Sequence, residues 1–222
     1  MRKTLLIAAA ALASSVISSQ AQVYSQNIVG YINVPLVTGY TALANQLDYD
    51  GTGTNNTVAT VFGTNLVAGT TVLAWEAASA SYVSANWILS RGALQWANKT
   101  NAISAALNAG QGVFVQSPST NNLTLVGTVL QGTNLLSLVT GYNFVSSVAP
   151  ISGDLVTNLG YTPSVGDNIL LWNNTTQSYK EYSYINSRGT SVWSPSVPQI
   201  SVGQSFFIQA AAAETWTNSF VE

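Results

Sequence analysis

The 222-residue sequence contains no cysteine and no histidine, and only 6% of its residues are charged. Without these residue types the chain cannot form a disulfide, a zinc site of thiolate or imidazole ligands, a Ser-His-Asp triad or a cysteine nucleophile. The 6 Lys and Arg residues are also too few for the basic surface that binds nucleic acid. We therefore expect no nucleic-acid partner and none of the common hydrolytic mechanisms.

The N-terminus has the three parts of a secretory signal peptide. A basic start at Arg2 and Lys3 precedes an apolar run over residues 4–17, and the small residues Ser19 and Ala21 follow. The apolar run is shorter than the roughly 20 residues that span a bilayer, which favours cleavage over membrane anchoring. The sequence predicts a bacterial Sec-type signal peptide at residues 1–21 and no transmembrane segment after its removal. We expect a secreted, cell-surface or periplasmic protein.

The sequence also repeats itself. The segment Leu-Val-Thr-Gly-Tyr at residues 36–40 recurs letter for letter at residues 138–142, a spacing of 102 residues. The spacing falls to 97 residues for Ser-Tyr at 81–82 and 178–179, and to 93 for Gly-Gln at 110–111 and 203–204. An ordered series of matches with a stepwise change in spacing indicates tandem duplication with two small deletions. We predict two homologous units, residues 22–129 and 130–222.

Within each unit the pattern is typical of short β-strands. The predicted strands are β-branched or aromatic and are bounded by Gly, Asn, Ser or Pro; they cover residues 31–34, 40–44, 71–75, 113–116, 123–126, 142–145, 168–172, 179–184 and 205–209. Turn signals about 8–12 residues apart favour antiparallel sandwiches or barrels over parallel folds. We predict an all-β fold of two tandem antiparallel sandwich or barrel-like units.

Helices are expected to be short and few. Candidates are residues 57–62, residues 153–159 with Ser152 and Asp154 as capping residues, and a helical turn at residues 102–109. The sequence leaves open whether the two units form separate domains or one body. Residues 131–134 are the best candidate for a linker.

Three segments resemble motifs of a large group of exported bacterial proteins. They are residues 23–33, residues 39–47 with the end Ala-Asn-Gln-Leu, and the strand Gly-Gln-Gly-Val-Phe-Val at residues 110–115. This resemblance covers nearly the whole chain after the signal peptide and implies export and a duplicated β-rich unit, but no activity. The second unit departs from the pattern at residues 146–148, Ser-Ser-Val, so any role of Asn45 and Gln46 belongs to the first unit alone.

A polar loop follows the motif that ends at Leu47. Asp48, Asp50 and Asn55 alternate there with Gly and Thr, and calcium prefers carboxylate and amide oxygens in such loops. The bidentate acid that closes an EF-hand loop is absent. We keep two interpretations open, a calcium site formed by these residues and a solvated Gly-rich turn, and expect no other cofactor.

Arg91 and Arg188 lie in matching Ser-Arg-Gly segments. Repetition of an arginine predicts a fixed geometric role, either as a cation that faces a ligand or as a guanidinium stacked on a tryptophan such as Trp96 or Trp193. The stack, which stabilises the fold, is the interpretation that we favour.

Aromatic side chains beside neutral polar ones suit sugar rings, which present apolar faces and hydroxyl edges. The tryptophans with a counterpart in the other unit are expected in the sandwich cores; they are Trp75 and Trp172, Trp96 and Trp193. Trp87, Tyr182 and Tyr184 were not matched in this way. We therefore expect these three to be exposed and to contact a ligand.

The acids do not indicate an enzyme. A glycosidase needs two carboxylates about 5–10 Å apart, and none of the 8 Asp and Glu residues occupies a matched position in both units. We expect a non-enzymatic protein with a structural or adhesive role, through self-association or contact with extracellular polysaccharide, because weakly charged strand edges pair readily. The alternative is a carbohydrate-binding module that uses exposed aromatic residues.

Overall fold

The computed structural model describes residues 28–97 and 102–221. The predicted signal peptide lies outside these ranges, as do residues 98–101 of the predicted loop insertion. Within the described ranges nearly all regular structure is β-strand, and every pair of named strands is antiparallel. The prediction of an all-β antiparallel fold is confirmed.

The first half of the chain forms a ribbon and a sheet. In the ribbon, β1 (Val29–Leu36) pairs with β7 (Asn121–Thr128). The five-stranded sheet has the order β2-β6-β3-β4-β5. Its strands are β2 (Gly39–Ala44), β3 (Thr70–Glu76), β4 (Ser81–Ser90), β5 (Ala93–Trp96) and β6 (Gly112–Ser117).

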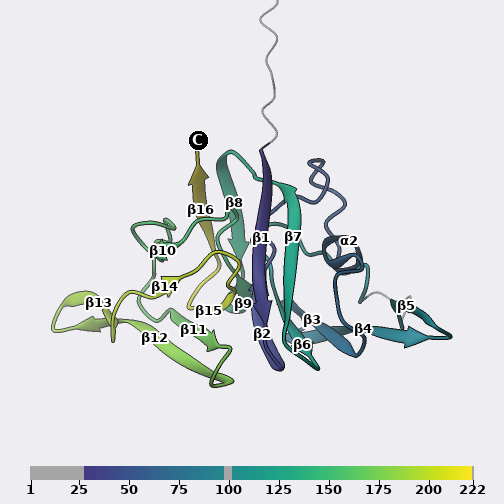
Figure 1. Ribbon diagram of the computed structural model, residues 1–222. Coiled ribbons are helices and arrows are strands. Elements are labelled where there is room, and N and C mark those ends of the chain that lie inside the picture. The colour runs from purple at the N-terminus through teal and green to yellow at the C-terminus, as the bar shows by residue number, and fades with distance from the viewer. Residues whose placement is uncertain (1–27, 98–101, 222) are drawn as a thin grey trace, which may run out of the picture.

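The second half has the same arrangement. β8 (Gly132–Leu138) pairs with β16 (Glu214–Phe220), and a five-stranded sheet has the order β9-β15-β11-β12-β13. Its strands are β9 (Gly141–Val145), β11 (Asn168–Asn173), β12 (Ser178–Ser187), β13 (Thr190–Ser194) and β15 (Phe206–Ala210), and a short pair is formed by β10 (Gly153–Asp154) and β14 (Gln199–Ile200). Figure 1 shows the two ribbons upright at the centre and the two sheets spreading to opposite sides below them.

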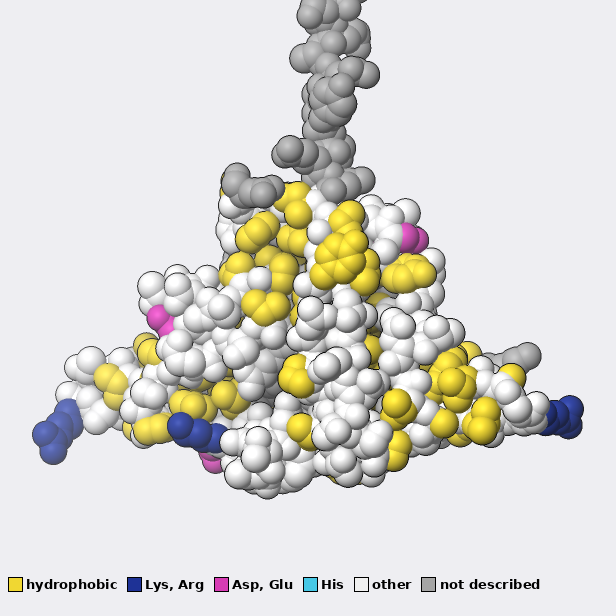
Figure 2. Space-filling model, viewed as in Figure 1, with side chains coloured by type: hydrophobic (Ala, Val, Ile, Leu, Met, Phe, Trp, Pro, Cys, Tyr) yellow, Lys and Arg dark blue, Asp and Glu magenta, His cyan; other side chains and the backbone are white. Residues whose placement is uncertain are grey.

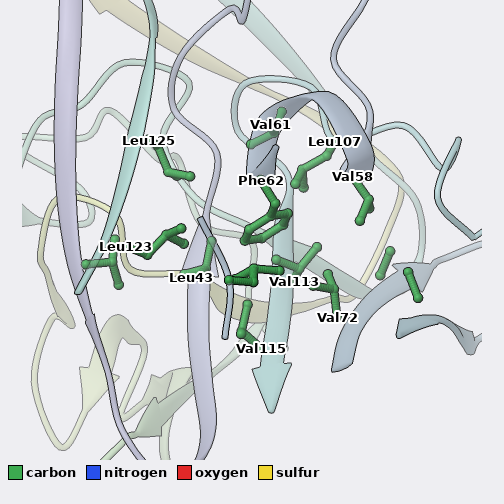
Figure 3. Close-up of a cluster of buried hydrophobic side chains, with 14 of the residues drawn as sticks. Leu43, Val58, Val61, Phe62, Val72, Leu107, Val113, Val115, Leu123 and Leu125 are labelled. Carbon is green, nitrogen blue, oxygen red and sulfur yellow. The ribbon is translucent and has the colours of Figure 1, made fainter. Parts of the chain in front are cut away.

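Each half has its own apolar core between ribbon and sheet. In the first half, Leu123 and Leu125 of β7 face Val113 and Val115 of β6, and Phe62 of α2 (Val58–Phe62) covers one end (Figure 3). Because alternate residues of a strand point to opposite faces, one face of β6 builds this core while Phe114 on the other face packs against the second half of the chain. The second core is built on residues such as Tyr161, Phe206 and Trp216.

The two halves meet along a buried contact that we call the seam. Its apolar part is a third cluster, formed by Ala42 and Phe114 of the first half and Phe144 and Phe207 of the second. Two backbone hydrogen bonds cross it, from Ala44 N–H to the Gly203 carbonyl and from Ser146 N–H to the Gly110 carbonyl, both 2.9 Å. The halves are thus joined by buried contacts, which the sequence left open.

Gln46 is fully buried at the seam. Its side-chain nitrogen donates to Ser147 Oγ at 2.8 Å and to the carbonyls of Ser147 and Ala149 at 3.2 Å, and its oxygen accepts from Gly203 N–H at 2.7 Å. Ser147 lies in the segment where the second half departs from the Asn-Gln pattern. That departure supplies hydrogen-bond partners for the buried side chain of Gln46.

The predictions of helices are correct in one case. Thr57 caps α2 through its side chain, which accepts from Thr60 N–H, so the helix predicted at 57–62 is present. The helix predicted at 153–159 is wrong: β10 pairs with β14 there, and the following residues form turns. Residues 102–109 also form turns rather than a helix. The linker candidate at 131–134 largely belongs to β8, where pairing with β16 orders it.

No helix in the described ranges has the length and hydropathy required to cross a membrane.

Candidate functional site

The outer faces of the two sheets bring aromatic rings together at the seam. The rings in mutual contact are those of Tyr40, Trp75, Tyr82 and Phe114 in the first half and Tyr142, Phe144, Trp172, Tyr179 and Phe207 in the second. The phenyl groups of Phe144 and Phe207 stack with their centroids 4.4 Å apart, and Phe114 lies 4.8 Å from Phe144. These buried phenyl groups form a rigid floor for the more exposed rings.

One groove opens over this floor. It has a volume of about 340 Å³ and is lined by Tyr40, Leu73, Tyr82, Phe114, Trp172 and Tyr179. The tyrosines at its rim are partly exposed, with 36% of Tyr40, 40% of Tyr82 and 44% of Tyr179 accessible to solvent. We call this space the aromatic groove. It offers apolar ring faces and phenolic hydroxyls to the same ligand.

The indole rings are held in place across the seam. Trp172 Nε1 donates to the Tyr40 carbonyl at 3.1 Å, and Trp75 Nε1 donates to the Tyr142 carbonyl at 2.9 Å. Each indole therefore belongs to one half and bonds to the backbone of the other. Because this satisfies the polar atom of each ring, the ring face has a fixed orientation.

Tyr82 and Tyr179 interact with each other at the centre of the site. Partial burial raises the pKa of the Tyr82 hydroxyl, and the neighbouring Tyr179 raises it further. Burial also raises the pKa of Tyr179, although the hydrogen bond with Tyr82 opposes this rise. Both phenols therefore stay protonated at neutral pH. Because one hydroxyl donates to the other, the pair has one O–H free to donate to a ligand, and both oxygens can accept from one.

Polar hollows adjoin the aromatic groove. Trp172 also lines a hollow of about 230 Å³ with Leu171, Asn173, Asn174, Lys180 and Gln204. Asn174 and Gln204 line a further hollow of about 200 Å³, together with Asn33 and other residues. The aromatic surface thus continues along the seam into a surface of neutral amides, with one cation at Lys180.

The aromatic residues predicted to be exposed are placed differently. Trp87 and Tyr182 are buried, with 3% and 6% accessible, so the expectation that they are exposed is wrong. Both point to the core face of their sheets, and Tyr184 is half-buried. Trp87 pairs with Trp96, and Tyr184 pairs in the same way with Trp193. These positions are therefore equivalent in the two halves, and none of them lines the aromatic groove.

The tryptophans Trp75 and Trp172 were expected in the sandwich cores. They lie instead in the seam cluster, half-buried, on the outer faces of the two sheets. Their strands have two covered faces, one against the core of their own half and one against the other half. Sequence alternation cannot tell these two faces apart when both are apolar.

Arg91 and Arg188 lie at the tips of hairpins. Both have a positive φ, 51° and 53°, and each is followed by a glycine with positive φ. The pair forms the two-residue turn between β4 and β5 or between β12 and β13. Among the described residues, the cation–π contact is formed by Lys180 over the ring of Tyr182 and not by either arginine. Figure 2 shows basic side chains at both lateral ends of the molecule, far from the seam.

The aspartates of the polar loop accept hydrogen bonds from the loop itself. Asp48 is buried, and its carboxylate accepts from Gly53 N–H and from the Asn56 side chain, both at 2.8 Å. Asp50 is exposed and accepts from the N–H and hydroxyl of Thr52, which lowers the pKa of the Asp50 carboxyl. The exposed Asn55 accepts at its carbonyl from Thr60 Oγ1. No cluster of three or more acids forms within the described ranges, and the calcium site stays a prediction.

The sequence pattern singled out neither Tyr40, Leu73 nor Phe114 as a groove residue. Tyr82 and Tyr179 belong to the aromatic set considered for sugar binding but were not among the residues expected to contact a ligand. A signal for three of them was present, because Tyr40 ends the repeated pentapeptide, and Tyr82 and Tyr179 belong to the repeated Ser-Tyr pair. For the repeated tryptophans, repetition predicts a core position. At a seam between two similar halves, repeated residues can instead line a shared surface.

No sequence family, no characterised protein and no solved structure matches this chain.

Proposed function

We propose that this protein is an exported, non-enzymatic carbohydrate-binding protein and that the aromatic groove at the seam is its binding site. The observation that carries the proposal is a set of partly exposed tyrosines around a floor of buried phenyl groups, with amide side chains in the adjoining hollows. This is the carbohydrate-binding alternative of the sequence analysis, with a different set of residues.

Sugars fit this surface for a chemical reason. A pyranose ring has apolar C–H faces, which pack on aromatic rings, and hydroxyl edges, which need neutral donors and acceptors. Tyr40, Tyr82 and Tyr179 supply both kinds of contact, and Asn174 and Gln204 supply amides. Strongly charged groups are scarce along the seam, which favours a neutral or weakly charged glycan over a phosphorylated ligand.

The lining favours binding without hydrolysis. Hydrolysis of a glycosidic bond by the usual mechanism needs two carboxyl groups on either side of the scissile bond. Among the described residues, those that line the aromatic groove and the two hollows beside it include no Asp or Glu. An exported protein that binds a glycan without cutting it would attach to, or crosslink, extracellular polysaccharide, which agrees with a structural or adhesive role.

The test is a titration of the purified protein with cello-, chito-, xylo- and manno-oligosaccharides, followed by tryptophan fluorescence. We expect a saturable change with at least one series, because Trp172 lines the groove. Tyr82→Ala should weaken that binding about tenfold, since one aromatic contact contributes up to about 1.5 kcal/mol. Tyr49→Ala is the matched control, because Tyr49 is 44% exposed in the polar loop and does not line the groove. Absence of saturable binding, or equal effects of the two variants, would reject the proposal.

Self-association is a second candidate, favoured by the apolar outer face of the β1–β7 ribbon. Val29 is 56%, Tyr31 68% and Val126 45% exposed, and Tyr31 and Val126 are register partners. Hydrophobic side chains gather on this upper part of the molecule in Figure 2. The occupant that we propose for this face is a second copy of the chain. Sedimentation should show a dimer that Tyr31→Asp dissociates; a monomer at all concentrations would reject it.

A further inference from the structure

The aromatic site has a twofold local symmetry that its sequence repeats did not reveal. Trp75 lies 5.3 Å from Phe207, and Trp172 lies 5.3 Å from Phe114. The other ring pairs repeat as closely. The ring centroids are 4.9 Å apart in Trp75–Tyr82 and 4.8 Å apart in the corresponding pair Trp172–Tyr179. They are 6.0 Å apart in Tyr40–Phe114 and 5.9 Å apart in Tyr142–Phe207. In Tyr82–Phe114 and in Tyr179–Phe207 the distance is 6.3 Å.

The hydrogen bonds across the seam follow the same symmetry. Each indole N–H donates to the backbone of the other half, Trp75 to Tyr142 and Trp172 to Tyr40. The backbone bonds Ala44 to Gly203 and Ser146 to Gly110 are related in the same way and have equal lengths of 2.9 Å. The local axis therefore passes between Tyr82 and Tyr179, at the centre of the aromatic surface.

Under this symmetry the lining of the aromatic groove has a counterpart on the other side of the axis. Tyr40 corresponds to Tyr142, Leu73 to Leu170, Phe114 to Phe207 and Trp172 to Trp75. Tyr82 and Tyr179 correspond to each other. The two sets share Tyr82 and Tyr179. Tyr142 is 42% exposed, as accessible as Tyr40 at 36%, so the second set also reaches solvent.

We infer that the two sets are the halves of one extended site, and that its occupant is a polysaccharide chain that runs over Tyr82 and Tyr179 and contacts both halves. This inference rests on the proposed function. A short sugar would fill one half of the site only, whereas a longer chain would fill both. Once the longer chain is bound to one half, its contact with the other half is intramolecular, and the high effective concentration of that second contact raises the overall affinity. Rotation about the axis also exchanges the two ends of the site. The site therefore presents the same surface to a polysaccharide chain bound in either orientation.

The symmetry is broken at one place in the floor. Phe144 occupies the position that corresponds to Ala42, and both are buried, with 4% and 3% accessible. A phenyl group in place of a methyl group changes the depth of one half. We therefore expect the halves to bind with unequal affinity rather than as identical sites.

The test uses the full protein and the oligosaccharide series that binds it, from disaccharide to octasaccharide. We expect the octasaccharide to bind about a hundredfold more tightly than the disaccharide. Tyr40→Ala and Tyr142→Ala should each weaken binding of the octasaccharide about tenfold, and Tyr49→Ala should not. If Tyr142→Ala binds the octasaccharide as the wild type does, while Tyr40→Ala is weakened, the extended site is rejected and the proposed function stands. If no oligosaccharide binds, the proposed function fails as well.

A second measurement does not depend on any variant. NMR of the unsubstituted protein resolves the indole N–H groups of Trp75 and Trp172, which lie in opposite halves. Titration with the octasaccharide should shift both resonances. A shift of the Trp172 resonance alone would show that only one half is occupied and would overturn the inference.

Discussion

Glu214, Tyr161 and Asp167 form a buried polar cluster in the second half. The Tyr161 hydroxyl lies 2.8 Å from Asp167 Oδ2 and 2.6 Å from Glu214 Oε1. The single phenolic proton of Tyr161 can be donated to only one of these carboxyl groups at a time. Asp167 also accepts hydrogen bonds from the N–H groups of Ser164 and Ala211.

This cluster predicts a pH dependence of stability. Burial raises the pKa of Glu214 above its ordinary value of 4.5, and the charge of Asp167 raises it further, although the hydrogen bond with Tyr161 opposes the rise. A raised pKa in the folded state stabilises the fold below the unfolded-state value, and this contribution is lost as the pH rises through the folded-state pKa. We expect the free energy of unfolding to fall over this interval in urea titrations.

Glu214→Gln should remove that fall, because a neutral amide cannot ionise. Glu76→Gln is the control, since Glu76 is exposed at the end of β3, and it should leave the fall intact. The same pH profile in Glu214→Gln as in the wild type would contradict a raised pKa of Glu214 in the folded protein.

The hairpin turns explain the repeated Ser-Arg-Gly segments at the scale of the element. Ser90 pairs with Ala93, which leaves Arg91 and Gly92 as a two-residue turn, and their φ values of 51° and 81° are those of a type I′ turn. Turns of this type match the twist of the strands but require left-handed backbone at both residues. Ser-Arg-Gly therefore recurs because both hairpins have the same type of turn. The predicted stack of the arginine on a tryptophan is not observed.

Arg91→Asn should stabilise the protein by up to about 1 kcal/mol, because asparagine adopts the left-handed region more readily than arginine. Arg91→Val is the opposing control and should destabilise it, because a β-branched residue is disfavoured at positive φ. Urea denaturation followed by the fluorescence of the Trp87–Trp96 pair measures both. A loss of stability in Arg91→Asn would mean that the arginine has a contact that this turn geometry does not include.

At this scale most of the strands could be predicted. Short β-branched and aromatic runs between turn residues marked β1, β2, β3, β6 and β7, and Thr57 marked the start of α2. The strands that were missed are β4, β5, β8, β13, β16 and the two-residue strands β10 and β14. In β8, Gly132, Thr133 and Asn134 have the composition of a linker. Pairing with β16 orders this segment, and such a long-range contact is not encoded in local composition.

The whole molecule depends on the seam, and Gln46 is its most specific polar contact. Gln46→Leu would leave Gly203 N–H and the carbonyls of Ser147 and Ala149 without these partners. A buried unsatisfied group costs about 1–3 kcal/mol, so we expect the free energy of unfolding to fall by at least about 2 kcal/mol. Gln95→Leu is the matched control on exposed β5. Equal stabilities of the two variants would show that the seam does not rely on this side chain.

The sequence by itself determined the all-β class and most strands, because alternation and turn residues act locally. It also contained the repeated residues that meet at the seam. Which of those residues line a surface was decided only by the tertiary structure. Two apolar faces of a strand look alike in sequence, and only the packing of one half on the other leaves Tyr40, Tyr82 and Tyr179 at the surface and places Trp87 in a core. The same packing explains why one half has Gln46 and the other has serines, since both contribute to a single buried network.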